Sequence, residues 1–188
     1  MKIGIYGGSF NPIHEGHIFV VNYVINALKL DKVLIIPVGI PSHRENNLLD
    51  GEKRLEMCKL AFSNDNNIQV LDIEINSKKE NYTYDTLMEL KNIYKNDELF
   101  EIIGEDSGEN FFKWKNYQEI LDNSKVVILR RKGYKNSLNH KNVIFLESPY
   151  IEVSSTELRK KIKNNEDVSG ELPKSVLEYI KHNKLYKN

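Results

Sequence analysis

The sequence contains a single cysteine, Cys58, among its 188 residues. One cysteine cannot form an internal disulfide, which fits a reducing compartment. Acidic and basic residues number 27 each, so no excess charge of either sign favours nucleic acid or a membrane surface. No apolar run approaches the roughly 20 residues that span a bilayer, and the run at the N-terminus is too short for a signal peptide. We therefore expect a cytoplasmic protein with no nucleic-acid and no membrane partner.

Arginine is scarce beside abundant lysine. The five arginines are Arg44, Arg54, Arg130, Arg131 and Arg159. Where lysine supplies most of the positive charge, an arginine can mark a place that needs a planar donor making two parallel hydrogen bonds. Chance placement is the alternative for each of them, and for Arg130 and Arg131 the choice is between a phosphate contact and an exposed strand end.

Apolar runs alternate with amphipathic stretches along the whole chain. The runs cover residues 2–6, 32–37, 68–75, 99–103, 125–129 and 143–146, and the helical stretches cover 16–29, 51–62, 83–94, 111–122, 155–164 and 173–182. Strands separated by helices predict right-handed βαβ units and a mostly parallel sheet. We predict an α/β fold, a doubly wound Rossmann-like parallel sheet with helices on both faces. We expect one domain over 1–188, with its core in 1–150 and a C-terminal helical segment in 151–188.

The first predicted strand runs into G-G-S-F-N-P-I-H-E-G-H, residues 7–17. Gly7 and Gly8 remove two Cβ atoms where a backbone turns or approaches a ligand. His14 and His17 stand three residues apart at a helix start, which puts both imidazoles on one side. The N–H groups of a helix start attract phosphate. A zinc site and capping or core histidines are the alternatives, and the absence of G-x-G-x-x-G disfavours a nicotinamide-dependent dehydrogenase.

Residues 7–17 resemble the H-x-G-H signature of the nucleotidyltransferase superfamily. From Lys2 to Tyr186 the chain is similar to the bacterial nicotinate-nucleotide adenylyltransferases. The similar segments are P-V-G-I-P-S-H-R at 37–44, R-L-E-M at 54–57, Y-T-Y-D-T-L at 82–87, G-E-D at 104–106 with the aromatic helix after it, and V-S-S-T-E-L-R at 153–159. Two positions depart from the family pattern: Arg44 replaces a lysine, and Tyr117 stands where a second tryptophan is common.

The resemblance implies adenylyl transfer from ATP to nicotinate mononucleotide, giving deamido-NAD and pyrophosphate in NAD biosynthesis. The attack would be direct and in line, with no covalent intermediate and with His14 and His17 as catalytic residues. The implied ATP contacts, besides the two histidines, are Gly7, Gly8, Ser9, Phe10, Gly104, Asp106, Ser154, Ser155, Thr156 and Arg159. The implied mononucleotide contacts are Asn11, His43, Arg44, Tyr82, Thr83, Thr86, Trp114, Tyr117 and Arg131. No metal site made by the protein is implied; Mg²⁺ would be bound through the ATP phosphates.

Several alternatives stay open at this point. Ser154 and Glu157 also form an S-x-x-E pattern, which predicts a capping box on local grounds alone. Phosphopantetheine adenylyltransferases share the H-x-G-H and S-S-T-x-[IV]-R motifs, although they commonly have threonine where His14 stands and lack Y-T-x-D-T-L. Three further alternatives stay open. The preferred acceptor could be nicotinamide mononucleotide, the protein could be a non-catalytic nucleotide-binding regulator on the same fold, and it could form a homo-oligomer.

Overall fold

A computed structural model describes residues 1–41, 48–130, 138–147 and 153–187. Its centre is a six-stranded sheet in the order β4-β2-β1-β6-β7-β8, and all of its pairings are parallel. The strands are β1 (Lys2–Gly8), β2 (Lys32–Pro37), β4 (Ile68–Val70), β6 (Glu98–Gly104), β7 (Lys125–Arg130) and β8 (Val143–Glu147). The chain leaves β1 toward β2 on one side and later returns to β6 on the other. The predicted doubly wound parallel sheet is therefore confirmed.

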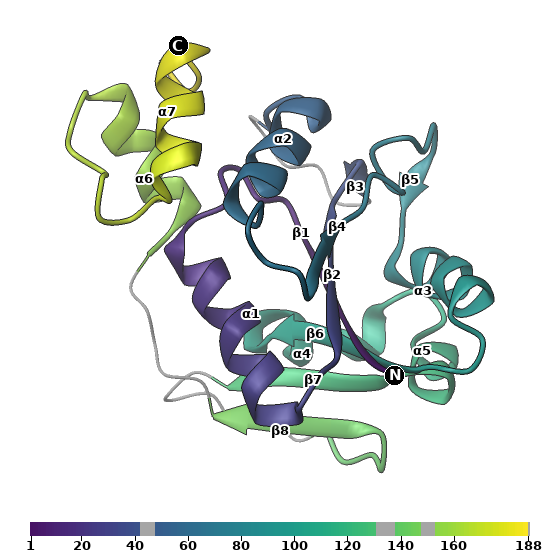
Figure 1. Ribbon diagram of the computed structural model, residues 1–188. Helices are drawn as coiled ribbons and strands as arrows, with labels where there is room; N and C mark the ends of the chain where they lie inside the picture. The colour runs from purple at the N-terminus through teal and green to yellow at the C-terminus, as the bar shows by residue number, and fades with distance from the viewer. Residues whose placement is uncertain (42–47, 131–137, 148–152, 188) are drawn as a thin grey trace.

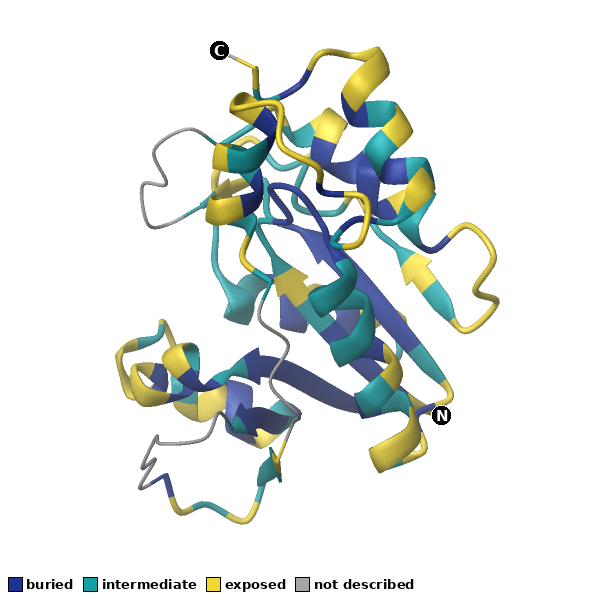
Figure 2. Ribbon diagram, turned by 90° about the vertical axis from the view of Figure 1, so that its left-hand side faces the viewer, coloured by how far each residue is buried: buried dark blue, intermediate teal, exposed yellow. Residues whose placement is uncertain are grey.

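Helices cover both faces of this sheet (Figure 1). The first face carries α1 (Glu15–Leu28), α2 (Gly51–Ala61), α6 (Ser155–Lys163) and α7 (Lys174–His182), and the second carries α3 (Thr83–Ile93) and α5 (Tyr117–Asn123). Side chains alternate along β2: Val33 and Ile35 join the first buried cluster, while Leu34 and Ile36 join the second. Strands buried on both faces explain the continuous apolar runs in the sequence. Figure 2 shows these buried strands between helices whose outer faces are exposed.

The C-terminal helices pack onto the sheet core. Leu158 of α6 and Val176 of α7 belong to the same buried cluster as Val21 of α1 and Met57 of α2. In Figure 1 α6 and α7 lie beside α2, beyond the carboxyl end of β1, where α1 begins. This packing brings the V-S-S-T-E-L-R segment to the same end of the molecule as residues 7–17.

Some predicted elements differ from those observed. The predicted strand at 68–75 ends at Val70, because the chain then turns, with the Asn76 N–H bonded to Asp72 O at 2.9 Å. The predicted helix at 111–122 is a 3₁₀ turn, η1 (Phe111–Lys113), followed by α5, since Asn116 adopts a left-handed φ of 50°. The helix α4 (Glu105–Glu109) and a two-stranded sheet of β3 (Ile40–Pro41) and β5 (Glu80–Asn81) were not predicted.

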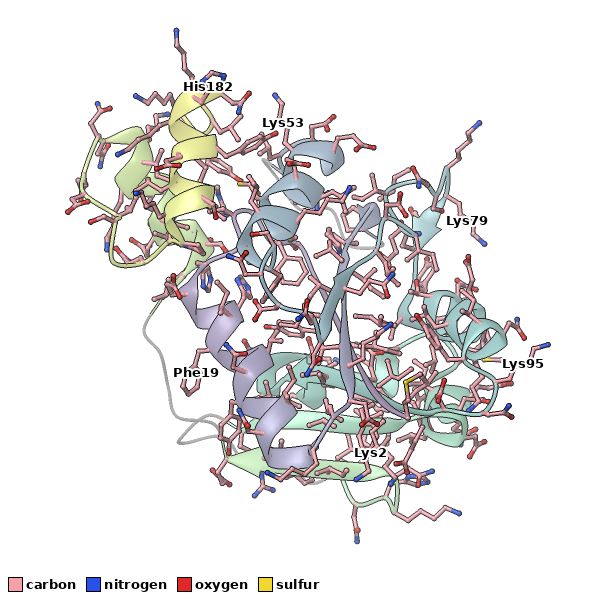
Figure 3. The ribbon with its side chains drawn as sticks, in the orientation of Figure 1. Lys2, Phe19, Lys53, Lys79, Lys95 and His182 are labelled. Atoms are coloured by element: carbon pink, nitrogen blue, oxygen red, sulfur yellow. The ribbon has the colours of Figure 1, made fainter. Side chains whose placement is uncertain are left out.

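Lysine side chains lie at the surface of the protein. Figure 3 shows the labelled lysines Lys53, Lys79 and Lys95 projecting away from the body of the protein. Within the part of the chain that the structure describes, no helix is both long and apolar enough to cross a membrane.

Candidate active site

The loop after β1 is shaped by an aromatic ring. Phe10 adopts a left-handed φ of 45° and is only 2% exposed. A Cβ atom on Gly8 would lie 3.1 Å from this ring, so any larger residue here would require the Phe10 ring to shift. A Cβ on Gly7 would meet only Ile36 O at 3.9 Å, so that glycine leaves the backbone open to a close approach. The peptide bond between Asn11 and Pro12 is cis.

His14 and His17 form a stacked pair at the start of α1. Their ring centres are 3.8 Å apart at an interplanar angle of 27°, and the backbone N–H of His14 donates to His17 Nδ1 at 3.2 Å. Gly16 lies close to this pair: a Cβ there would lie 3.0 Å from the His14 ring, so the ring would have to shift. Since Nδ1 of His17 accepts a hydrogen bond, its neutral ring carries the proton on Nε2 and can donate it.

Both imidazoles are neutral at physiological pH. Burial lowers the pKa of His14 to about 4. Burial lowers the pKa of His17 well below its usual range, and the charge of nearby His14 adds to this effect. His14 is 6% exposed, and its Nδ1 has no hydrogen-bond partner among the described residues. The pair therefore offers neutral N–H donors, not two permanent charges.

The helix start offers fewer open amides than the sequence suggests. The N–H of Glu15 donates to Glu171 O at 3.0 Å, so this amide is already used. A zinc ion would need a third ligand, and no group of three or more His, Cys, Asp or Glu side chains able to hold a metal occurs within the described ranges.

The start of α6 packs directly against the β1 loop. Ser155 Oγ donates to Pro12 O at 3.0 Å, and Arg159 Nη1 donates to Asn11 O at 2.8 Å. Arg159 Nη2 also donates to Thr156 Oγ1 at 3.3 Å. These bonds join two predicted phosphate-binding motifs that lie more than 140 residues apart in the sequence. The structure thus brings the V-S-S-T-E-L-R motif and residues 7–17 into one site.

The capping box predicted at Ser154 is not formed. Ser154 is the N-cap residue of α6, but its side chain makes no capping hydrogen bond. Glu157 instead accepts a hydrogen bond from Lys160 Nζ at 2.8 Å. An exposed glutamate three residues from a lysine on a helix forms such a pair at little cost. The exposed Ser154 hydroxyl is therefore left without the local role that its sequence pattern suggests.

Gly104 and Asp106 lie at the carboxyl end of β6, the strand beside β1. Gly104 ends β6, which pairs directly with β1, and Asp106 lies in the first turn of α4. This is the point where the strand order reverses, the usual ligand position in doubly wound sheets. A Cβ added to Gly104 would meet nothing within 4 Å, so the glycine leaves this end of the strand uncovered.

Four of the predicted acceptor residues lie at the start of α3 and in the segment from η1 to α5: Tyr82, Thr83, Trp114 and Tyr117. Tyr82 is its N-cap residue and Thr83 its first residue. Trp114 is partly buried between η1 and α5, with its ring 5.4 Å from that of Phe111. Tyr117, which begins α5, packs edge-on against Phe111 at 6.2 Å. Trp114 and Tyr117, the two predicted aromatics, therefore both pack against Phe111 and lie on the same side of the sheet.

Thr86 is already engaged by the protein. It is buried, and its hydroxyl donates to Glu74 Oε1 at 2.7 Å. Burial raises the pKa of Glu74, while hydrogen bonds from Thr86 and the Gly39 N–H oppose that rise. Gly39 has no alternative here, since a Cβ would lie 1.9 Å from Glu74 O. The sequence missed Glu74, because a glutamate after a short edge strand carries no signal of burial.

Arg54 is a second residue whose role the sequence did not define. Its side chain is 1% exposed and donates to three carbonyls: Leu49 O at 2.7 Å, Ser9 O at 2.8 Å and Val38 O at 2.7 Å. A planar guanidinium with five donors can bridge such a set, whereas an ammonium cannot. Arg54 thus connects the β1 loop, through Ser9 O, with Val38. The next residue, Gly39, donates its N–H to Glu74. The scarcity of arginine was the available signal.

The other predicted residues divide in two groups. Arg130 lies over the Phe145 ring at 4.1 Å and faces Glu147 on β8 at 3.5 Å, which is the strand-end alternative. His43, Arg44 and Arg131 lie outside the described residues. Ile40 and Pro41 lie beside Glu80 and Asn81, because β3 pairs with β5 and the Ile40 N–H donates to Asn81 Oδ1 at 3.0 Å.

The fold and this site define a nucleotide-binding α/β protein of the nucleotidyltransferase class. The cytidylyltransferase-like family matches residues 5–161. A probable nicotinate-nucleotide adenylyltransferase of Fusobacterium nucleatum subsp. nucleatum is 53% identical over 187 residues, which cover 96% of this chain and 97% of that protein. One from Clostridium tetani is 34% identical over 198 residues, covering 99% of each chain. The chain therefore belongs to the nicotinate-nucleotide adenylyltransferase family, as the sequence motifs predicted.

Solved structures support the fold independently. The Plasmodium falciparum nicotinic acid mononucleotide adenylyltransferase complexed with NaAD has a TM-score of 0.80 at 21% identity, with 98% of this chain and 97% of that chain covered. A putative nicotinate-nucleotide adenylyltransferase from Vibrio parahaemolyticus has a TM-score of 0.74 at 24% identity, covering 100% and 96%. At these identities the likeness concerns the fold.

Proposed function

We propose that this protein transfers the adenylyl group of ATP to nicotinate mononucleotide, releasing pyrophosphate and deamido-NAD, a step of NAD biosynthesis. The observation that carries the proposal is the contact between the two phosphate-binding motifs, in which Ser155 and Arg159 bond to the Pro12 and Asn11 carbonyls beside the histidine pair. A site with hydrogen-bond donors from the histidine pair on one side and from the start of α6 on the other suits a triphosphate bound between them.

ATP binds at the carboxyl ends of β1 and β6, where the strand order reverses. Gly7, Gly8, Ser9 and Phe10 supply its backbone wall, and Gly104 leaves room beside it. Asp106 accepts from the ribose hydroxyls. Ser154, Ser155, Thr156 and Arg159 hold the outer phosphates. Ser155 acts through its backbone N–H, because its hydroxyl donates to Pro12 O. Arg159 has five N–H donors, and the protein contacts described above use only two of its nitrogens.

Nicotinate mononucleotide lies on the α3 side. The amides at Tyr82 and Thr83 hold its carboxylate, because a helix start favours an anion. Trp114 stacks on the pyridine ring, with Tyr117 beside it, as a flat electron-poor ring suits an aromatic partner. Thr86 acts through its backbone position, since its hydroxyl is bound to Glu74. Asn11, His43, Arg44 and Arg131 complete the set around the mononucleotide phosphate.

The reaction is an in-line attack of the mononucleotide phosphate on the α-phosphorus of ATP. The P–O bond to the attacking oxygen forms as the bond to pyrophosphate breaks, without a covalent intermediate. The attacking oxygen is already anionic, so no general base is needed. Catalysis rests on positioning and on charge stabilisation. The Nε2–H of neutral His17 and the imidazole of His14 donate to the phosphate oxygens, where negative charge must be accommodated.

A divalent cation accompanies ATP in phosphoryl and nucleotidyl transfer, where it neutralises phosphate charge. We assign this role to Mg²⁺ bound to the triphosphate. The described residues contain no cluster of three or more His, Cys, Asp or Glu side chains that would hold the ion alone. In this proposal Mg²⁺ enters with ATP, as part of the nucleotide substrate.

The direct test is an acceptor panel. The purified protein is given ATP and Mg²⁺ with nicotinate mononucleotide, nicotinamide mononucleotide or phosphopantetheine, and pyrophosphate and dinucleotide are measured. We expect the highest kcat/KM with nicotinate mononucleotide. Turnover with phosphopantetheine alone would replace the proposal with that transferase, and pyrophosphate release with none of the three would favour a non-catalytic regulator.

A further inference from the structure

Lys115 links the Trp114 segment to the first turn of α3. Its Nζ lies 2.8 Å from Asp85 Oδ2. The same ammonium lies 4.7 Å from the centre of the Tyr82 ring and 5.9 Å from that of the Tyr84 ring. None of the sequence motifs singled out Lys115, yet its side chain contacts the turn to which the proposed function assigns the pyridine carboxylate.

This turn carries negative charge of its own. Asp85 lies in the first turn of α3, and Glu80 accepts a hydrogen bond from the Tyr82 hydroxyl at 3.0 Å. Both side chains would repel an arriving carboxylate, because charges of the same sign repel each other. The helix start attracts an anion only modestly. Cancelling the charge of Asp85 therefore changes how well this turn accepts a carboxylate.

The Lys115–Asp85 pair can be altered without emptying a core. The two side chains are 43% and 30% exposed, so water screens them and they contribute little to stability. The hydrogen bond to Asp85 raises the pKa of Lys115, which keeps the ammonium charged at neutral pH. A substitution of Lys115 or Asp85 can thus change the choice of acceptor without lowering the stability of the fold.

We infer that Lys115 is a specificity-determining residue: by neutralising Asp85 at the start of α3, it makes the acceptor pocket favour nicotinate mononucleotide over nicotinamide mononucleotide. The inference rests on the proposed function, because it requires the pyridine ring to lie beside Trp114. A carboxylate is a full charge and responds to this compensation, whereas an uncharged carboxamide responds little.

The test is a double-mutant cycle read as an acceptor ratio. The kcat/KM values for the two mononucleotides are measured in the wild type, Lys115→Ala, Asp85→Asn and the double variant. Lys115→Ala should lower the nicotinate-to-nicotinamide ratio by about three- to tenfold, the range expected of a partly screened charge, mainly through KM for nicotinate mononucleotide. Asp85→Asn should restore the ratio in the double variant and retain or raise it alone.

Lys113→Ala is the matched control. Lys113 lies on the same segment, but its Nζ bonds Asn110 Oδ1 at 3.0 Å, so its removal should leave the ratio unchanged. An unchanged ratio in Lys115→Ala overturns the inference, and so does a double variant that remains as unselective as Lys115→Ala. A wild type that makes no dinucleotide from nicotinate mononucleotide overturns the proposed function instead, so the two failures are distinguishable.

Discussion

At the scale of single residues, the histidine pair shows how burial decides chemistry. Two imidazoles stacked at 3.8 Å cannot both be charged cheaply, and burial holds the pKa of each below its usual value. The hydrogen bond from the His14 N–H fixes which nitrogen of His17 carries the proton. The site therefore presents oriented neutral donors before any ligand arrives, which is what stabilisation of developing charge requires.

His17→Ala should lower kcat for dinucleotide formation by roughly 100-fold or more, the usual cost of losing one such donor. ATP affinity should change little, because the loop backbone and α6 still hold the nucleotide. Steady-state kinetics and calorimetric ATP binding measure the two effects. His182→Ala removes an exposed histidine at the end of α7 (Figure 3) and serves as the control. An unimpaired kcat in His17→Ala would remove His17 from the catalytic assignment.

At the scale of elements, β6 carries a carboxyl on a face that is otherwise apolar. Glu101 is 4% exposed, between Leu99 and Ile103, whose side chains belong to the cluster beneath α3 and α5. Burial raises its pKa from 4.5 to about 8, and the negative charge of Glu74 adds to the rise. Between these two pH values the folded protein binds a proton that the unfolded chain has lost.

The free energy of unfolding should therefore fall as pH rises through this range, by at most roughly 1.4 kcal/mol per pH unit for one group. Glu101→Gln should remove this part of the loss. Urea unfolding from about pH 5 to about pH 8 measures the slope in the wild type, in Glu101→Gln and in Glu119→Gln, an exposed control on α5. Parallel slopes for all three proteins would show that Glu101 does not titrate as proposed.

At the scale of the whole molecule, the sequence predicted the parallel sheet because its strands are continuous apolar runs and its long helices are amphipathic. It could not predict β3 and β5, since two-residue strands have no periodicity. The left-handed Asn116 that divides the predicted helix at 111–122 also has no pattern of its own. The pairing of β1 with β6 joins segments more than 90 residues apart, so it follows from the fold and not from a local pattern.

The sequence predicted the candidate site residues that lie in motifs. It did not predict the residues whose place in the site depends on tertiary contacts. Residues 7–17 and 153–159 each had a signature, although only the fold brings Arg159 to Asn11 O. The contacts that orient the site could not be predicted even where one partner lies in a motif: Arg54 with its three carbonyls, Glu74 with Thr86, and Lys115 with Asp85. Such contacts join segments far apart in the chain, so spacing along the sequence does not reveal them.

The central claim is a single direct transfer of the adenylyl group to nicotinate mononucleotide at this site. The stereochemical course tests it most directly: the protein is given nicotinate mononucleotide and one diastereomer of ATP with sulfur on the α-phosphate, and the product is analysed by ³¹P NMR. One in-line displacement predicts the sulfur analogue of deamido-NAD with inverted configuration at phosphorus. Retention of configuration, which two successive displacements through a covalent intermediate produce, would contradict the account, as would the absence of this dinucleotide.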